Sequence, residues 1–459
     1  MKILHYSLGL PPFRTGGMTR YCLDLMSEQI KKGYDVSFIY PGVLRNKKKT
    51  VKVKSHGRIK VNNFYINKCY EIINPLPIPL LDGIKDIKLF QISKDINIFN
   101  DFFSKNNYDV LHIHTFMGMP YELLEAAKRV GVRLIYTSHD YFSVCPRGNL
   151  FNNGKICIDD NECHDCILCN KNALSYEKMY LLQSNFYRIL KDKKFIRALR
   201  KKHNNQLYNE KLEFNNNKSS ISNYDEKLSI DYKLMRKKNM DWLNKFDIVH
   251  FNSKNTLEIY KRYGKTEDNS KIISISNESI LDQRKKRNKI KIKSVLSFGY
   301  LGPITTHKGY QLLKHCCDLL WDKGIKNFEV HIFSHTEDNR PYFKKHSPYT
   351  HEELENVMKN FDILVVPSLC NETFGFTTLE ALSFGVPVIV TENVGAKDLV
   401  FNDKNGRIVN ANINDLFNVM KELIISPNKV HLYQKWILEK GNVKTMSQHS
   451  EEILDLYKL

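Results

Sequence analysis

Residues 365–390 read VVPSLCNETFGFTTLEALSFGVPVIV, and this stretch predicts a strand, a loop, a helix and a second strand. Phe361–Val366 and Val386–Val390 are short apolar runs of the kind that form parallel strands covered on both faces. Between them we expect a helix over Phe376–Phe384, because Gly385 supplies a common helix ending. This order is typical of an open α/β sheet.

Two glutamates belong to this segment: Glu372 lies in the predicted loop, and Glu380 lies eight residues later, one to two turns into the predicted helix. The amides and the positive dipole at a helix N-terminus favour an anion, so a phosphate is expected there. Carboxylates beside a phosphate are best explained as ligands of neutral hydroxyls, although a solvated pair is the simpler alternative. A glycosidase pair is disfavoured, because an all-helical spacing separates the two by roughly 12 Å and such pairs lie about 5 to 9.5 Å apart.

These residues resemble the Glu-x7-Glu signature of the retaining, nucleotide-sugar-dependent glycosyltransferases of group 1, family 4. The pattern continues through Ala381, Gly385, Pro387, Val388, Gly395 and Asn405-Gly406. The resemblance implies an α/β fold of the GT-B type, with two Rossmann-like domains that face a cleft. It further implies that Glu372 contacts the donor sugar and Glu380 the ribose diol. The donor diphosphate would meet amides of the segment Phe374, Gly375, Phe376 and Thr377.

Lys308 lies on a glycine-containing loop after the apolar run that begins near residue 294. A lysine there can neutralise the diphosphate and stabilise the departing nucleotide. The family has a lysine at this position and usually an arginine five residues earlier, where this chain has Pro303. We expect His307 or another basic residue to replace that arginine, or activity to be lower.

The N-terminal half carries a second set of candidate residues. Gly16 and Gly17 follow the first predicted strand and would let backbone amides approach the donor diphosphate. His114 and His139 end two further apolar strands, at positions where the family has histidines near the donor sugar. With Glu372 and Lys308, they are the predicted catalytic residues. The alternative for each histidine is a buried side chain with a satisfied hydrogen bond.

The predicted domains follow the alternation of strands and helices. An N-terminal Rossmann-like acceptor domain covers 1–280, with a cysteine-rich and basic helical insertion at about 145–240. A polar, basic linker at 281–293 leads to a C-terminal nucleotide-sugar domain at 294–435. The resemblance implies that a last helix, 436–459, crosses back to the first domain.

Five of the ten cysteines lie close together in the sequence: Cys145, Cys157, Cys163, Cys166 and Cys169. Spacings of this kind suit a closed structural zinc site, in which four of the five would be ligands. A subgroup of the family has a similar cysteine-rich insertion. The alternative is a cluster of reduced thiols without metal, since disulfides are rare in the cytosol. No cofactor is expected at the active site, because no Asp-x-Asp pair occurs in the chain.

The formal net charge is +20, with the excess concentrated between Lys171 and Lys245. No nucleic-acid-binding motif accompanies it, so nucleic acid is not an expected partner. A basic amphipathic segment through Met179, Phe186, Ile189, Ile196 and Leu199 suits an anionic membrane surface, although packing on its own domain explains it too. Without a signal peptide or a spanning segment, the protein is expected in the cytoplasm, peripherally on the inner face of the membrane.

The expected function is transfer of a hexosyl group from a UDP- or GDP-sugar to an acceptor hydroxyl, with retention, in the synthesis of a surface polysaccharide or a lipid-linked glycan. Two alternatives are a catalytically impaired partner of another transferase, which Pro303 favours, and a nucleotide-sugar epimerase. An epimerase would need no acceptor.

Overall fold

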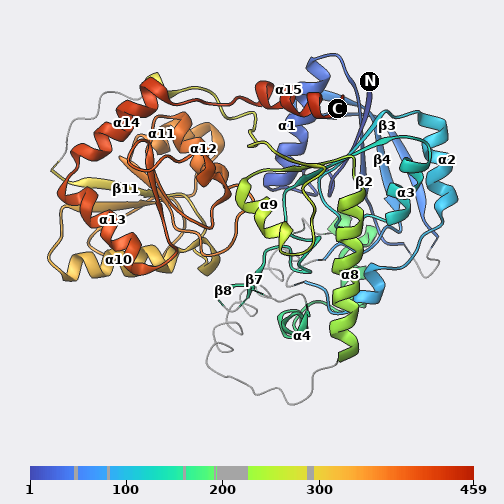
Figure 1. Ribbon diagram of the computed structural model, residues 1–459, viewed down its shortest axis with the longest axis horizontal. Coiled ribbons are helices and arrows are strands. Elements are labelled where there is room, and N and C mark those ends of the chain that lie inside the picture. The colour runs from blue at the N-terminus through green and yellow to red at the C-terminus, as the bar shows by residue number, and fades with distance from the viewer. Residues whose placement is uncertain are drawn as a thin grey trace. The chain divides into compact units, whose positions relative to one another are not determined.

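The computed structural model describes residues 1–45, 50–79, 83–152, 154–158, 162–190, 193, 226–286 and 294–459. Ile196, Leu199 and residues 287–293 of the predicted linker lie outside the described residues. The chain divides into two compact units (Figure 1). The first unit comprises residues 1–148, 157–250 and 262–270, and the second comprises 149–156, 251–261 and 271–459.

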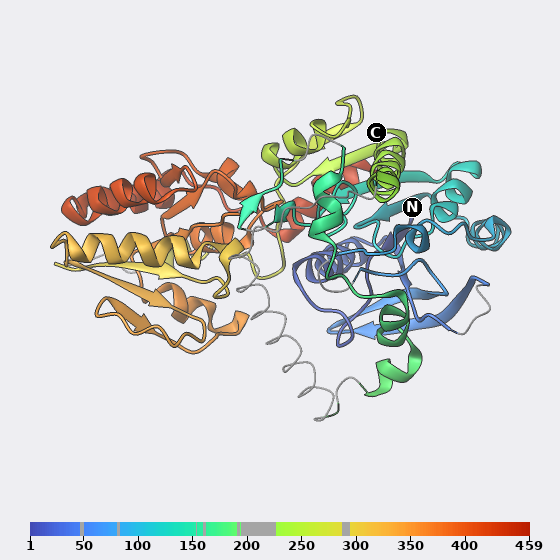
Figure 2. The same cartoon turned by 90° about the horizontal axis from the view of Figure 1, so that it is seen from below.

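The first unit is built on an eight-stranded sheet with the strand order β10-β9-β6-β5-β1-β2-β4-β3. Its strands are β1 (Lys2–Tyr6), β2 (Asp35–Pro41), β3 (Lys52–Val61), β4 (Phe64–Ile73), β5 (Val110–Ile113), β6 (Arg133–Ser138), β9 (Ile248–Phe251) and β10 (Ser270–Ile272). Strand β1 pairs in parallel with β2 and β5, and β5 pairs in parallel with β6. The antiparallel β3–β4 pair forms one edge and is drawn in blue in Figure 2.

Helices of the first unit connect these strands or belong to the insertion. They are α1 (Gly17–Lys31), η1 (Ile87–Phe90), α2 (Ile96–Asn106), α3 (Tyr121–Arg129), α4 (His164–Cys169), α5 (Tyr176–Leu182), α6 (Asn185–Leu190) and α8 (Glu226–Lys245). The central strands are apolar because they are covered on both faces: Ile3, Leu4 and Tyr6 of β1 are fully buried.

The described part of the predicted basic amphipathic segment forms two short helices, α5 and α6. The break falls at Gln183, whose side chain accepts from the backbone N–H of Ile78 and donates to its carbonyl, both at 2.9 Å. Arg188 of α6 donates to the buried carboxylate of Glu71 on β4 at 2.9 Å, and its guanidinium lies over the ring of Phe13. These contacts fix the insertion on the first unit.

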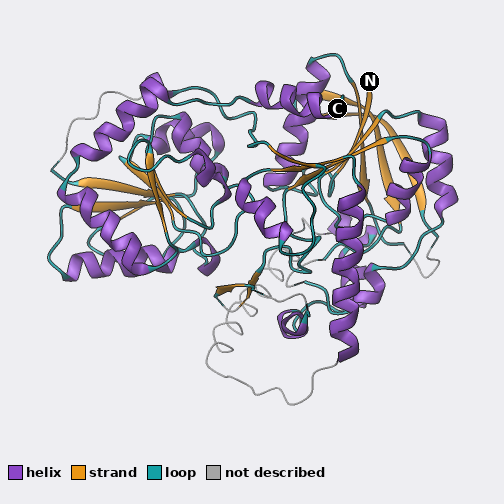
Figure 3. Cartoon of the chain, in the orientation of Figure 1, coloured by secondary structure: helices purple, strands orange, loops and turns teal. Residues whose placement is uncertain are grey.

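The second unit is built on a six-stranded parallel sheet with the order β13-β12-β11-β14-β15-β16, and helices lie on both of its faces (Figure 3). Its strands are β11 (Leu296–Tyr300), β12 (Phe328–Ile332), β13 (Phe343–Lys345), β14 (Ile363–Val366), β15 (Val388–Thr391) and β16 (Gly406–Val409), and the short hairpin β7 (Phe151–Asn152) and β8 (Lys155–Ile156) stands apart from this sheet.

Its helices are α9 (Lys254–Lys261), η2 (Arg284–Lys286), η3 (Thr306–Lys308), α10 (Tyr310–Asp322), η4 (His351–Glu353), α11 (Leu354–Met358), α12 (Phe376–Ser383), η5 (Gly395–Leu399), α13 (Ile413–Ile425), α14 (Asn428–Lys440) and α15 (Met446–Leu456). The strand, helix and strand predicted around Glu372 are therefore present as β14, α12 and β15. In the described part of the predicted linker, Arg284 donates to the carbonyls of Ile437 and Gly441 at the end of α14, at 2.7 and 2.5 Å.

The order of strands in the second sheet reverses between β11 and β14. From β11 the chain moves outward through β12 and β13, and then returns to build β14, β15 and β16 on the other side. Ligands of open α/β sheets bind at such a reversal, outside the carboxyl ends of the strands. The loops that follow β11 and β14 are therefore the place to look for a site.

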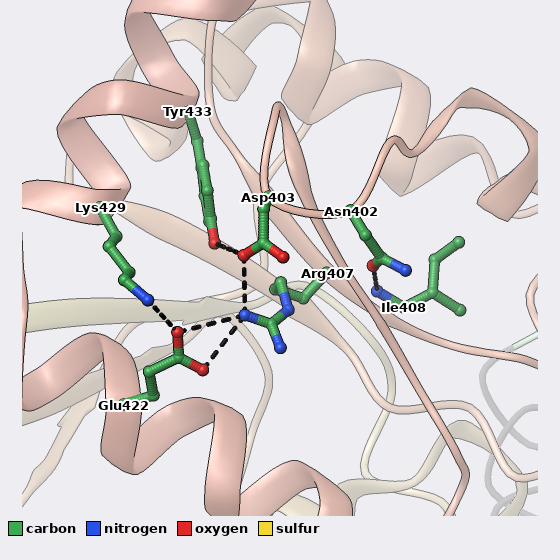
Figure 4. A network of polar contacts seen from close by, with 7 residues as sticks. All are labelled: Asn402, Asp403, Arg407, Ile408, Glu422, Lys429 and Tyr433. Carbon is green, nitrogen blue, oxygen red and sulfur yellow. Dashed lines mark hydrogen bonds and ion pairs between the residues drawn. The ribbon is translucent and has the colours of Figure 1, made fainter.

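A polar network joins the last strand of this sheet to two helices (Figure 4). Arg407 of β16 donates to Asp403 at 2.9 Å and to Glu422 of α13 at 3.1 Å. Asp403 also accepts from the hydroxyl of Tyr433 on α14 at 2.8 Å, and Glu422 pairs with Lys429. The network holds α13 and α14 to the edge of the sheet opposite β13.

None of the described helices is both long enough and apolar enough to cross a membrane.

Candidate active site

The loops after β11 and β14 are in direct contact. The amides of Leu369 and Cys370 donate to the carbonyl of His307 at 2.9 and 3.2 Å. Gly309 has a φ of +74°, and a Cβ at this position would lie 1.7 Å from the carbonyl oxygen of Pro367. Only glycine allows the two loops to approach this closely.

This contact brings Lys308 to Glu372, with Nζ and Oε2 2.9 Å apart. The hydroxyl of Ser368 donates to the other oxygen of the same carboxylate. Burial alone would lower the pKa of Lys308, but the charge and hydrogen bond of Glu372 outweigh it and the pKa is raised. Lys308 is therefore a permanent cation, paired with a carboxylate.

The backbone around Glu372 is fixed by its neighbours in the second unit. The Glu372 amide donates to the carbonyl of Asn393 at 2.9 Å, and the amide of Gly395 donates to the carbonyl of Glu372 at 3.1 Å. A Cβ on Gly395 would lie 2.3 Å from the carbonyl oxygen of Thr373. That oxygen also accepts from the hydroxyls of Ser253 and Thr256, each at 3.0 Å.

Helix α12 begins directly after this loop. Its N-cap is Gly375, with a φ of +99° that favours glycine. The first amides of a helix, here those of Phe376 and Thr377, have no acceptor within the helix. Such amides, together with the helix dipole, favour an anion. The helix begins four residues after Glu372, the ionic partner of Lys308. The rings of Phe374 and Phe376 meet edge to face, with centroids 5.5 Å apart.

Glu380 lies farther along α12, is almost fully buried, and has different partners. Its Oε1 lies 3.9 Å from Nδ1 of His351. The pKa of the Tyr349 hydroxyl is raised, first by burial and then by the charge of Glu380. Glu372 and Glu380 therefore have different neighbours: Glu372 pairs with Lys308, whereas Glu380 lies near His351. Neither Tyr349 nor His351 was predicted from the sequence.

Pro303 occupies the position of the usual arginine without a cationic side chain. Its carbonyl accepts from the hydroxyl of Tyr300 at 2.7 Å and from the amide of Thr305 at 2.8 Å, so the loop keeps a defined shape. His307 lies beside Lys308 on η3. Its ring meets that of Phe151 edge to face, with the ring centroids 6.3 Å apart.

The first unit brings His114 and His139 together, with Nδ1 of His114 3.2 Å from Nε2 of His139. His114 is fully buried and is also 3.0 Å from His5 of β1. Burial lowers the pKa of His114 well below its usual value, and the neighbouring histidines add to this. Burial lowers the pKa of His5 to about 4, despite a hydrogen bond to Gln29. The histidines at the strand ends are thus members of a larger buried group.

Asp140, next to His139, was missed from the sequence. Its carboxylate accepts from the hydroxyl of Thr115 at 2.9 Å and from the amide of Phe142 at 2.8 Å. Burial nevertheless raises its pKa to about 6, against the effect of these hydrogen bonds.

Gly16 and Gly17 lie at the start of α1 in the same unit. Gly16 has a φ of +122°, whereas Gly17 is the first residue of the helix. A Cβ at either position would meet nothing within 4 Å, so the surroundings leave room above both. The positive φ explains the glycine at position 16, whereas no contact of the described residues explains the one at position 17.

Contacts of the cysteine-rich insertion join four of its five cysteines. The pKa of the Cys166 thiol is raised, first by a hydrogen bond with Cys163, then by burial, and further by the charges of Cys163 and Cys145. Burial raises the pKa of Cys169, against the charge and hydrogen bond of Arg147, and the charge of Cys145 adds to the rise. None of the ten cysteines forms a disulfide.

Among the described residues, three side chains outside the insertion have metal-ligand atoms within 4.8 Å of one another: His5, Cys22 and His114. No three sulfur atoms of the five insertion cysteines, all of which the structure describes, lie within that distance of one another.

Two family models match the chain. The model for glycosyl transferases group 1 matches residues 295–426, and that for glycosyltransferase family 4 matches residues 15–156. Among curated proteins, an uncharacterised 42.6 kDa protein of the cps region of Klebsiella pneumoniae is 26% identical over 148 residues. That match covers 31% of this chain and only 38% of the relative's length.

Solved structures resemble the chain over its whole length. Sucrose-phosphate synthase from Thermosynechococcus elongatus has a TM-score of 0.57 at 14% identity and is matched over 100% of this chain and 98% of its own. A glycosyltransferase from Rickettsia africae has a TM-score of 0.56 at 12% identity, over 100% and 97%. Anabaena HepE in complex with UDP and glucose has a TM-score of 0.52 at 14% identity, over 99% of each chain. These likenesses show the fold, which is GT-B with two Rossmann-like domains.

The buried histidines predict that the protein loses stability in acid. His5 titrates near pH 4 when folded and near 6.5 when unfolded, so between these values the unfolded chain binds the proton more tightly. At pH 5 this costs roughly 2 kcal/mol for His5 alone. His114 acts in the same direction, whereas Asp140, with its raised pKa, opposes them between about pH 6 and 4.

We therefore expect the thermal unfolding midpoint to fall between pH 7 and 5. The fall should be steeper in Asp140→Asn, which removes the opposing group, and shallower in His5→Gln. Differential scanning calorimetry at half-unit pH steps measures these slopes. A midpoint that does not change over this range in all three proteins would contradict the assignment of neutral, buried histidines.

Proposed function

The chain belongs to the group 1 and family 4 glycosyltransferases, and from this premise we propose that it moves a hexosyl group from a UDP- or GDP-sugar to an acceptor hydroxyl with retained anomeric configuration. The acceptor is proposed to be a glycan or lipid-linked glycan of surface polysaccharide synthesis, reached from the cytoplasmic side of the membrane.

The observation that carries the proposal is the Lys308–Glu372 pair beside the N-terminus of α12. Lys308 supplies a cation and Glu372 a carboxylate, and the amides of the first turn of α12 follow in the same loop. All of them lie where the strand order of the parallel sheet reverses. The cation and the amides suit a diphosphate, and the carboxylate suits the hydroxyls of the attached sugar. A nucleotide sugar offers both groups in one molecule.

The chemistry that these residues support is displacement of the nucleoside diphosphate. As the bond from the anomeric carbon to the phosphate oxygen breaks, negative charge grows on the phosphate, where Lys308 and the amides of Phe376 and Thr377 stabilise it. The acceptor oxygen attacks the same face of the sugar, and its proton passes to the leaving phosphate. Glu372 orients the sugar. A covalent sugar adduct trapped on Glu372 would contradict this route.

Complexes of proteins with the same fold support a nucleotide-sugar donor. Anabaena HepE has been solved with UDP-glucose, and the catalytic domain of starch synthase IV from Arabidopsis thaliana with ADP and acarbose.

Replacing Lys308 tests the donor site. We expect Lys308→Met to lower kcat about 100-fold with the nucleotide sugar that the wild type uses, because the leaving phosphate loses its cation. Glu380→Gln should instead raise the donor KM about tenfold, the effect of one hydrogen bond to a charged group. Transfer from a panel of UDP- and GDP-sugars, followed by release of the nucleoside diphosphate, measures both.

Lys314→Met is the matched control, because Lys314 is also paired with a carboxylate, Asp318, at 3.4 Å on α10. Its kinetics should equal those of the wild type. If the wild type releases no nucleotide with any donor and acceptor, the impaired-partner alternative replaces the enzyme proposal.

We also propose that α5 and α6 contact an anionic membrane. Leu181, Phe186 and Ile189 are 54%, 67% and 68% exposed, although Met179 on the same segment is fully buried. Exposed Lys171 and Lys178 lie in the same part of the chain. Apolar side chains next to lysines suit the interface of an anionic bilayer.

Vesicle sedimentation tests the membrane proposal. The wild type should bind phosphatidylglycerol vesicles and not pure phosphatidylcholine vesicles, and Phe186→Ser with Ile189→Ser should weaken binding at least tenfold. The control pair Ile425→Ser with Leu432→Ser changes equally exposed apolar residues of the second unit. Equal binding by both double variants would contradict the proposed surface.

A structural zinc held by four of the five insertion cysteines, Cys145, Cys157, Cys163, Cys166 and Cys169, is a further proposal. Cysteine sulfurs are common ligands of structural zinc, and two of them have a cationic neighbour here: Arg147 donates to the sulfur of Cys169 at 3.3 Å and Arg236 to that of Cys166 at 3.8 Å. Such donors stabilise the thiolates that zinc requires. Zinc would then hold the insertion together and take no part in transfer.

Metal analysis tests this proposal. The purified protein should contain about one zinc per chain, and Cys166→Ser should lose it together with several degrees of thermal stability. Cys316→Ser, a buried thiol of the second unit, is the control and should keep the metal. A metal-free wild type whose insertion thiols react freely with a thiol reagent would overturn the proposal.

A further inference from the structure

Four side chains of the first unit form a continuous hydrogen-bonded chain. Oε1 of Gln29 lies 2.7 Å from Nε2 of His5, and Nδ1 of His5 lies 3.0 Å from Nε2 of His114. Nδ1 of His114 lies 3.2 Å from Nε2 of His139. Gln29, His5 and His114 are fully buried, whereas His139 is partly exposed. The chain therefore runs from the core of the unit to its surface.

The chain crosses three neighbouring strands. Gln29 belongs to α1, His5 to β1, and His114 and His139 directly follow β5 and β6. These strands are adjacent in the sheet, in the order β6-β5-β1. His112 stacks on His114 with ring centroids 4.3 Å apart and bonds instead to Thr137, so it belongs to a separate branch.

Each link of this chain fixes the next one. An amide oxygen only accepts, so Nε2 of His5 must carry the proton. A neutral imidazole has one N–H, so Nδ1 of His5 accepts and Nε2 of His114 must donate to it. The same step places the proton of His139 on Nε2, facing Nδ1 of His114. The neutrality that this requires agrees with the burial of His5 and His114, which lowers the pKa of both.

We propose that Gln29 and His5 are positioning residues that hold His139 as its Nε2–H tautomer, so that its Nδ1 can only accept a hydrogen bond. This inference rests on the proposed function in one respect: it takes His139 to meet a hydroxyl of the sugar substrate. A hydroxyl that reaches His139 then donates to it, and His139 is not a proton donor in the transfer.

A metal ion at His5, Cys22 and His114 is the competing explanation, because their ligand atoms lie within 4.8 Å of one another. A metal would need Nδ1 of His5 and Nε2 of His114 both without protons, whereas their separation of 3.0 Å is that of a hydrogen bond.

Nitrogen-15 NMR of the full-length protein with labelled histidines distinguishes the two neutral tautomers directly. The signals of His5 and His139 are assigned with His5→Gln and His139→Gln. We expect the Nε2–H form at both residues in the wild type and in Gln29→Glu, which keeps an acceptor. Gln29→Leu removes the acceptor and should give a mixed or reversed tautomer at His139. Gln434→Leu, a buried glutamine of the second unit, should change nothing.

Transfer kinetics give a second readout. Gln29→Leu should lower kcat about tenfold, the effect of one lost hydrogen bond, with a normal donor KM, and Gln29→Glu should restore it. The proposal is overturned by an Nδ1–H tautomer at His139 in the wild type, by stoichiometric metal that bonds to His5, or by an altered tautomer that leaves kcat unchanged. If Gln29→Leu does not fold, the tautomer of His139 is compared between the wild type and Gln29→Met instead. If the wild type shows no transfer, the proposed function is refuted. The NMR spectrum would still test the hydrogen-bonded chain from Gln29 to His139.

Discussion

Two close backbone contacts define the site of the second unit. Gly309 approaches the carbonyl of Pro367, and Gly395 approaches the carbonyl of Thr373, each to a distance that excludes any Cβ. The first contact holds the loop after β11 against the loop after β14. The second holds the loop after β14 against the segment after β15. Because of both, the cation of one loop meets the carboxylate of the other at the start of α12, and the chemistry proposed for the chain depends on that meeting.

Much of this site could be predicted from the sequence because its signals are local. The apolar runs and Gly385 predicted β14, α12 and β15, and the resemblance identified Glu372, Glu380 and Lys308. The partners that hold these residues have no local signal. Ser253 lies 120 residues from Thr373 and reaches it only through the fold. Tyr349 and His351, the neighbours of Glu380, are likewise brought to it from a different loop.

The first unit shows the same limit for polar residues of the core. The apolar strand patterns predict that His114 and His139 end two strands, but not that His5 and Gln29 join them from other elements. Asp140 was not predicted as a site residue, because its raised pKa comes from burial, which only the fold produces. In the insertion, near-helical spacing suggested one amphipathic segment. Gln183 breaks its described part into two helices, because its amide bonds to the backbone of Ile78.

The Lys308–Glu372 pair has a consequence for selectivity. Without a ligand the two charges satisfy each other, so any incoming anion must compete with an internal carboxylate. Inorganic phosphate could take Lys308, but it would leave Glu372 beside a second negative charge with nothing to bind. A molecule that carries both a phosphate and a sugar replaces both halves of the pair at once. For the proposed donor, we therefore expect binding by an exchange of ionic partners, and weak binding of inorganic phosphate without any steric barrier.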